Sequence, residues 1–389
     1  MQEHEFILNY ARTDPVPGPG DTALKIDWPY TIDQATRHRV TPLLYNNLKN
    51  HPLPASVIKK MENIYNYTAF HNMLYLEELQ RVIDKSDQAG IKLIVLKGPM
   101  LAQNVYQNIA LRPFADMDIL VSPQDCDRME AILEDMGYIA ADKSFYKKYH
   151  FHLPLFKPGK MPVHLELHWS FVDKFIIQKI DMDTIWPAAE KHELPVEINI
   201  LYLLLHIEKH AFFNKLIYNS GNARDWIFLQ PHGNQLLWYT DLHELMSRNN
   251  INWPRLINLA HNYGIASLVY YNLHILRQLY PLKLPDFLPR PVMGRIKRFV
   301  YRAALKKAAS LPMNPDLQLR PARAADLVNY LFPAPLTMKD YYCFPDYIPS
   351  IIAYLFHLVK GIREILKEFV GICRQKLSIK KRNEFPAAN

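Results

Sequence analysis

Residues 91–121 read IKLIVLKGPMLAQNVYQNIALRPFADMDILV, and this stretch decides the fold that we expect. Leu93–Leu96 form a short continuous apolar run, which is typical of a strand buried on both faces. Lys97, Gly98 and Pro99 then end the strand, because glycine can take a turn conformation and proline suits the first position of a helix. The order predicts a strand, a tight turn, a short helix, a loop and a second strand. A glycine and a helix N-terminus at the end of a strand are a common way to hold a phosphate.

The second strand carries two carboxylates. Asp116 and Asp118 alternate with Met117, so both carboxylates are expected on one face of the strand. Pro113 biases the backbone of Arg112 toward an extended conformation. The side chain of Arg112 is therefore expected to point toward the same region.

A hairpin is expected further along the chain. Phe151–Phe156 and Val163–Trp169 are strand-like runs joined by the turn residues KPGKM. In the second run His164, Glu166 and His168 share one face. A polar face of this composition predicts contacts with something other than solvent.

Composition limits the class of protein. The chain has 389 residues, of which 49% are hydrophobic, so it can bury a large core. Its three cysteines form no CxxC pair, which argues against a disulfide framework or a cysteine-built zinc site. The first residues show no secretory signal, and no run approaches the roughly 20 apolar residues that span a bilayer. These features predict a cytoplasmic protein, and the net charge of +8 suits an anionic partner.

Four regions are expected along the chain: an N-terminal helical region at residues 1–66, an α/β core at 67–175, a helical domain at 176–345, and a C-terminal amphipathic helix with a basic tail at 346–389. In the first part the sequence predicts one helix from Ala55 to about Tyr67 and another that ends before Gly90. The expected inner face of the latter comprises Met73, Leu76, Leu79 and Ile83. Later helices are expected at ILYLLLHI, Gln235–Met246, Pro254–Tyr263 and Ala266–Leu279.

The carboxylates suit phosphoryl transfer with a divalent metal. Magnesium prefers oxygen ligands and keeps open positions for triphosphate oxygens. In such a site Asp116 and Asp118 would bridge the metals, and Glu166 would complete the second metal and orient or deprotonate the attacking hydroxyl. Lys97 and Arg112 could neutralise phosphate charge. A lone DxD pair is also compatible with a polar strand end or a turn.

The order of these motifs resembles the uncharacterised nucleotidyltransferase family of the polymerase-beta-like superfamily. The resemblance rests on LKG after the first strand, Tyr106, Arg112-x-x-x-Asp116-x-Asp118, Gly137-Tyr138 and LELHW. It extends to RHRVTPLLYNNL, LEELQRVIDKSDQAGIK, LLLHIEKHAF, WYTDLHEL, INWPRL and LFPAPLTMKDYY, and covers roughly residues 5–360.

This resemblance implies an α/β (α+β) fold with a small mixed-sheet nucleotidyltransferase core between helical regions. It implies two Mg²⁺ ions and transfer of a nucleoside monophosphate from a nucleoside triphosphate, with ATP as the expected donor, to an unknown acceptor. By motif, the catalytic and metal residues are Asp116, Asp118 and Glu166, and residues expected near the nucleotide are Lys97, Gly98, Arg112, His168 and Asp241. Many members of the superfamily have Gly-Ser after the first strand, whereas this chain has Gly98-Pro99. The departure leaves a catalytically silent nucleotide-binding or scaffold protein as the alternative function.

Several residues have two interpretations. His164 and His168 flank Glu166 and could form a transition-metal site, but histidine often only hydrogen-bonds a ligand carboxylate. Asp241 could approach the base or ribose, or make a structural helix bond. His206 and His210 have a zinc-compatible spacing without a third ligand in register, which favours a packing or capping pair.

Two basic segments suggest further partners. Arg290–Lys307 has seven basic residues and no acid, with Phe299 and Tyr301 among them, so it could bind nucleic acid or form a solvated face. The last amphipathic helix could lie on an anionic membrane surface or pack against the helical domain. Packing is the favoured interpretation of that helix, nucleic acid is not the favoured partner, and the oligomeric state stays open.

Overall fold

The computed structural model describes residues 2–16, 26–141, 143–172, 180, 182, 185–189, 191–217 and 235–285. The basic segment Arg290–Lys307 and the expected C-terminal amphipathic helix lie outside these residues. The chain separates into two compact units, one of residues 1–206 and 236–269 and the other of residues 207–235 and 270–389. The first unit contains the sheet and the candidate site. The four regions expected from the sequence stay a prediction.

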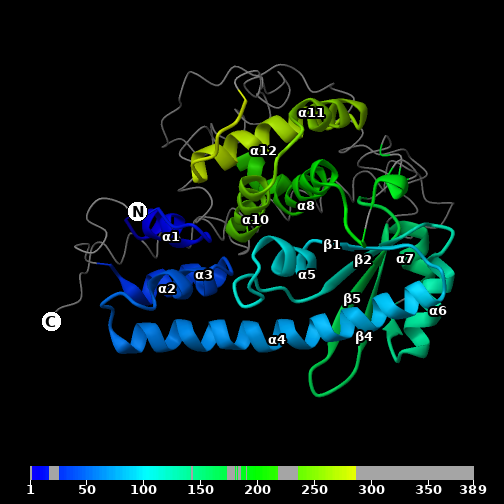
Figure 1. Cartoon of the computed structure of the whole chain (residues 1–389), viewed down its shortest axis with the longest axis horizontal. Helices are drawn as coiled ribbons and strands as arrows, with labels where there is room; N and C mark the ends of the chain where they lie inside the picture. The colour runs from blue at the N-terminus through cyan, green and yellow to red at the C-terminus, as the bar shows by residue number, and fades with distance from the viewer. Residues whose placement is uncertain are drawn as a thin grey trace, which may run out of the picture. The chain divides into compact units, whose positions relative to one another are not determined.

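Four described helices precede the sheet (Figure 1): α1 Gln2–Tyr10, α2 Trp28–Arg37, α3 Thr41–Leu48 and α4 Ala55–Gln88. The side chain of Asp27 caps α2 by accepting a hydrogen bond from the Tyr30 amide at 3.0 Å. Helices α3 and α4 pack against each other, and α4 continues past β1 and α6.

Helix α4 corrects two expectations. It is one helix of 34 residues rather than two, because no glycine or proline interrupts residues 55–88. Of the four residues expected on its inner face only Leu79 is buried, and Met73 is 51% exposed. The buried face of α4 differs from the expected one because it includes polar residues that make contacts. It comprises Val57, Met61, Thr68, Asn72, Tyr75, Glu78, Leu79, Val82 and Ser86.

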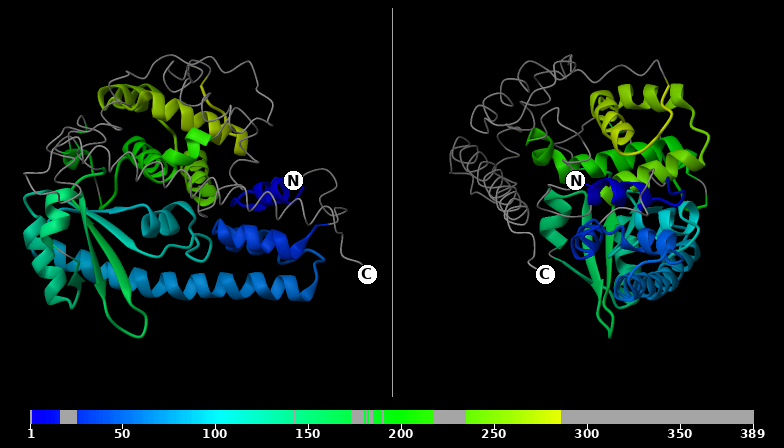
Figure 2. Two further views of the ribbon diagram at one scale, coloured as in Figure 1. Left: turned by 180° about the vertical axis from the view of Figure 1, so that it is seen from behind. Right: turned by 90° about the vertical axis from the view of Figure 1, so that its left-hand side faces the viewer.

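The sheet has five strands in the order β1-β2-β5-β4-β3. They are β1 Leu93–Leu96, β2 Met117–Val121, β3 Ile139–Ala140, β4 His152–Lys157 and β5 Val163–His168. Among the described strands only β2 and β5 pair in parallel, and the other neighbours are antiparallel. The two expected strands of the opening stretch and the expected hairpin are confirmed, and Figure 2 shows the β4–β5 hairpin extending past α4. The α+β fold is therefore confirmed.

Short helices connect the strands. After β1 the chain forms α5 Gly98–Met100 and one π-helical turn, η2 Leu101–Val105. Helix α6 Cys126–Asp135 follows β2, and α7 Lys143–Tyr149 precedes β4. The turn after β1 differs from expectation, because the positive φ of 33° falls on Lys97 rather than on Gly98.

Helices dominate the rest of the described chain: η4 Trp186–Ala188, α8 Val196–Ile217, α10 Gln235–Arg248, α11 Trp253–Asn262 and α12 Ala266–Leu279. The three expected helices from Gln235 onward are confirmed with bounds within two residues. No described helix is long and apolar enough to cross a membrane.

Candidate active site

The register of three strands brings a cation and two carboxylates together. Asp118 of β2 lies beside Glu166 of the parallel strand β5, and beside Leu96 of the antiparallel strand β1. Because Lys97 follows Leu96, its Nζ reaches Oδ2 of Asp118 at 3.0 Å. The side chain of Asp118 is fully buried, whereas that of Glu166 is 28% exposed.

His168 closes this group from the same face of β5. It follows Glu166 by two residues, so both side chains project from one side of the strand. Its Nε2 lies 3.0 Å from Oδ1 of Asp118 and 3.2 Å from Oε2 of Glu166, so one N–H faces two carboxylates. The rings of His168 and His152 stack with centroids 5.1 Å apart. Asp118, Glu166 and His168 each offer a ligand atom within 4.8 Å of the others.

The charges in this group influence one another strongly. Burial lowers the pKa of Lys97, but Asp118 and the other nearby acidic groups outweigh burial and raise it overall. Burial likewise lowers the pKa of His168, and its hydrogen bonds to Asp118 and Glu166 raise it above the ordinary value. Burial raises the pKa of Glu166, but the hydrogen bond and charge of His168 depress it overall. In this cluster Lys97 and His168 therefore neutralise the carboxylates of Asp118 and Glu166.

Asp116 lies just before β2 and is half-buried. It stands outside the close set that Asp118, Glu166 and His168 form among the described residues. Burial and the charges of Asp118 and Glu166 raise its pKa, which places its carboxyl group in the same electrostatic environment. Its loop is held by Asn72, whose side-chain amide donates to the carbonyl of Arg112 at 2.8 Å.

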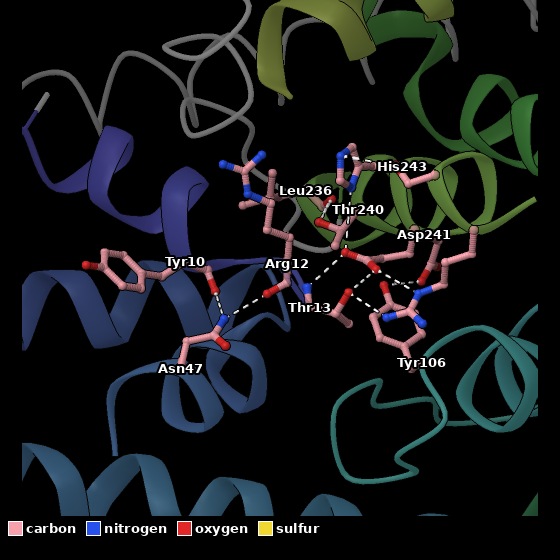
Figure 3. A network of polar contacts seen from close by, with 12 residues as sticks. Tyr10, Arg12, Thr13, Asn47, Tyr106, Leu236, Thr240, Asp241 and His243 are labelled. Carbon is pink, nitrogen blue, oxygen red and sulfur yellow. Dashed lines mark hydrogen bonds and ion pairs between the residues drawn. The ribbon is translucent and has the colours of Figure 1, made fainter. Parts of the chain in front are cut away.

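Arg112 is engaged by Asp241 of α10. Its Nη2 lies 2.7 Å from Oδ2 of Asp241, and its Nε donates to Oδ1 at 3.2 Å. The Tyr106 hydroxyl donates to the same Oδ1 at 2.9 Å, and Figure 3 shows Tyr106 beside Asp241. These contacts join α10 to the segment before β2, and the expected proximity of Arg112 and Asp241 to a nucleotide stays a prediction.

Gly98 is closely packed. A Cβ atom at this position would lie 3.0 Å from Cβ of Phe114 and 3.3 Å from Nη1 of Arg112. Pro99 and Met100 are also buried. The glycine therefore permits a close approach of the Phe114 segment, and its expected contact with triphosphate stays a prediction.

Three neighbours of the site were not anticipated from the sequence. His152 pairs with His168 in the β4–β5 register, and its Nε2 lies 3.8 Å from Oε2 of Glu166. Tyr202 of α8 is buried; burial and nearby acidic groups raise its pKa, while Lys97 opposes that shift. Arg39 precedes α3, and the charges of Arg112 and Asp116 both act on it. The alternating pattern of β4 could have indicated His152, whereas no local pattern marks the other two.

Comparison with known proteins identifies one family. The model of a family described as "Uncharacterised nucleotidyltransferase" matches residues 25–281, which include both strands of the opening stretch, the β4–β5 hairpin and α10. No curated protein and no solved structure matches the chain. The family model spans more than half of the chain and includes Lys97, Asp116, Asp118 and Glu166. The chain therefore belongs to the uncharacterised nucleotidyltransferase family.

Proposed function

We propose that the protein transfers a nucleoside monophosphate from a nucleoside triphosphate, with ATP as the expected donor, to an acceptor and releases pyrophosphate. An oxygen of the acceptor would bond to the α-phosphorus while the bond from that phosphorus to the pyrophosphate oxygen breaks. The observation that carries the proposal is the register of Asp118 with Glu166, which sets two carboxylates side by side with Lys97 and His168 around them. Membership of the family supports it.

The residues present fit a divalent cation. Oδ2 of Asp118 contacts Lys97, but no hydrogen bond of good geometry from a described residue reaches it. Nδ1 of His168 is buried and likewise has no hydrogen-bond partner among the described residues. Asp118 and Glu166 would hold Mg²⁺ with Asp116 nearby, and His168 would hydrogen-bond the carboxylates. The ion would neutralise phosphate charge and position the triphosphate.

Lys97 and Glu166 would contribute the other interactions with the phosphate and the acceptor. Lys97 holds a positive charge against Asp118, where it can also attract a phosphate oxygen. Glu166 is more exposed than Asp118, so it is the carboxylate of this pair that an acceptor hydroxyl can reach and donate a hydrogen bond to.

The experiment compares the unmodified chain with Asp118→Asn. The unmodified chain should bind a nucleoside triphosphate in the presence of Mg²⁺ and release pyrophosphate when the acceptor is supplied, and Asp118→Asn should lose the metal-dependent binding. Asp127→Asn is the matched control, since Asp127 is 86% exposed and pairs with Lys147 at the surface. Equal binding by the two variants would reject the proposal.

A second candidate is a catalytically silent nucleotide-binding or scaffold protein. The close packing of Gly98 against Phe114 and the ion pair of Arg112 with Asp241 favour it, since neither group is then free for a phosphate in this structure. A mass-shift search for nucleotidylated products after incubation with each of the four triphosphates separates the two. Any pyrophosphate release that depends on Asp118 excludes the silent alternative.

A further inference from the structure

Arg39 occupies an unusual turn between α2 and α3. Its φ of 57° lies in the left-handed region, which non-glycine residues seldom adopt. Two backbone hydrogen bonds hold the turn, from the Arg39 amide to the Thr36 carbonyl at 3.0 Å and from the Val40 amide to the Ala35 carbonyl at 2.8 Å. The backbone from which the Arg39 side chain projects is therefore closely constrained.

Arg39 is half-buried, yet its guanidinium makes no hydrogen bond or ion pair with any residue that the structure describes. A guanidinium carries five N–H donors, and burying an unpaired charge is costly. Burial and the charge of Arg112 lower the pKa of Arg39, while the charge of Asp116 raises it. Arg39 thus lies within the electrostatic range of Asp116 without being neutralised by it.

Helix α4 connects the surroundings of Arg39 with the loop that carries Asp116. His71 stacks on Tyr75 with ring centroids 4.2 Å apart, and burial together with the charge of Arg39 lowers the pKa of His71. The next residue, Asn72, donates hydrogen bonds to the carbonyls of Ile109 and Arg112. The same helix therefore lies near Arg39 and holds the segment that leads to Asp116.

Arg39 and Arg112 differ in the hydrogen-bond partners of their guanidinium groups. Both guanidinium groups are within range of Asp116, but Asp241 already accepts two hydrogen bonds from Arg112. The guanidinium N–H donors of Arg39 make no hydrogen bond to a described residue and can bind another acceptor. An arginine fork matches the oxygens of a phosphate group, and such charge-assisted hydrogen bonds are among the strong ones.

We propose that Arg39 binds a phosphate group of the nucleoside triphosphate, an inference that rests on the proposed function and assigns a second phosphate contact beside Lys97. The ligand is the triphosphate chain itself, so the base and ribose do not enter the contact.

The test is the affinity for ATP and for inorganic tripolyphosphate, each with Mg²⁺, measured by calorimetry on the full chain. Arg39→Gln removes the charge and keeps a long side chain, and should weaken both ligands about 10- to 100-fold. Arg39→Lys keeps the charge without the fork and should recover part of the affinity. Arg37→Gln is the matched control two residues away, because the charges of Asp33 and Tyr30 act on Arg37; it should leave both affinities unchanged.

The outcomes separate this inference from the proposed function. If the unmodified chain binds neither ligand, the proposed function fails and the inference fails with it. If the unmodified chain binds both ligands and Arg39→Gln binds them equally well, the inference alone is overturned. Thermal unfolding checks the fold: Arg39→Gln should melt at the same temperature as the unmodified chain or higher, since it removes an unpaired, half-buried charge.

Discussion

Arg112 and Asp241 lie 129 residues apart in the sequence and form a buried ion pair joined by two hydrogen bonds. The pair joins the loop before β2 to α10. Figure 3 shows Asp241 in a wider polar network. Three residues further along α10, Glu244 accepts a hydrogen bond from the Thr13 amide at 2.9 Å. This network connects α10 both to the N-terminal segment and to the loop that leads to Asp116.

Loss of Asp241 should destabilise the protein strongly. Asp241→Asn leaves the charge of Arg112 buried and unpaired, so the free energy of unfolding should fall by about 3 to 5 kcal/mol. Denaturant unfolding measures this change. Glu77→Gln is the control, because its pair with Arg81 is exposed and should contribute at most about 1 kcal/mol. A loss for Asp241→Asn as small as that of the control would show that the pair is not important for stability.

Gly98 and Gly90 should respond to alanine for different reasons. The new Cβ of Gly98→Ala would press against Cβ of Phe114, so overpacking should cost about 1 to 3 kcal/mol of unfolding free energy. Gly90→Ala meets no atom within 4 Å, and its cost of about 1 kcal/mol comes from the positive φ of 65°. Adding Phe114→Gly, which removes the Cβ atom that the new methyl group would meet, should reduce the effect of Gly98→Ala and not that of Gly90→Ala. Chemical denaturation of the single and double variants tests this, and identical responses would refute the packing explanation.

His38 should make stability depend on pH. Burial, with the charges of Arg37 and His4, lowers the pKa of His38 from 6.5 to about 3 in the folded protein. As the pH falls below 6.5, the unfolded state therefore binds a proton that the folded state does not, and the free energy of unfolding falls. Between pH 7 and pH 5 the unmodified chain should lose about 2 kcal/mol more than His38→Gln.

Unfolding of His38→Gln and of the control His261→Gln at several pH values measures this difference. His261 is exposed, so its variant should follow the unmodified chain. Parallel curves for all three proteins would contradict the expected role of His38.

Mg²⁺ should stabilise the folded protein through Asp118. A ligand that binds only the folded state at one hundred times its dissociation constant adds about 2.7 kcal/mol to the free energy of unfolding. Asp118→Asn removes a carboxylate from the close set with Glu166 and His168, so this gain should disappear. Thermal melts with and without Mg²⁺, followed by chelation, measure the effect. An equal gain in Asp118→Asn would mean that the ion binds elsewhere.

Much of the local structure could be predicted because its signals are local. The apolar run Leu93–Leu96, the turn residues between β4 and β5, and the helical periodicity after Gln235 all gave elements that the structure confirms. The predicted inner face of α4 was wrong. Hydrophobicity alone did not reveal that polar residues such as Asn72 and Glu78 are buried and form hydrogen bonds. Their partners lie 40 and 79 residues away along the chain.

In the candidate site, too, local patterns predicted some residues and not others. Alternation along a strand places Glu166 and His168 on one face, and the motif order pointed to Asp118, Glu166 and Lys97, which the structure brings together. The partner of Arg112, the constrained turn at Arg39 and the approach of Tyr202 had no local signal.

By itself the sequence determined the strands, most helices and the carboxylates, because strand alternation, helical period and turn chemistry act between near neighbours in the chain. Only the tertiary structure decided which charges are neutralised. Arg112 and Arg39 are both arginines near Asp116, yet one is paired with Asp241 and the other is not. That difference depends on long-range packing of α10 and the α2–α3 turn, since electrostatic pairing is set by distance in space rather than by separation in sequence.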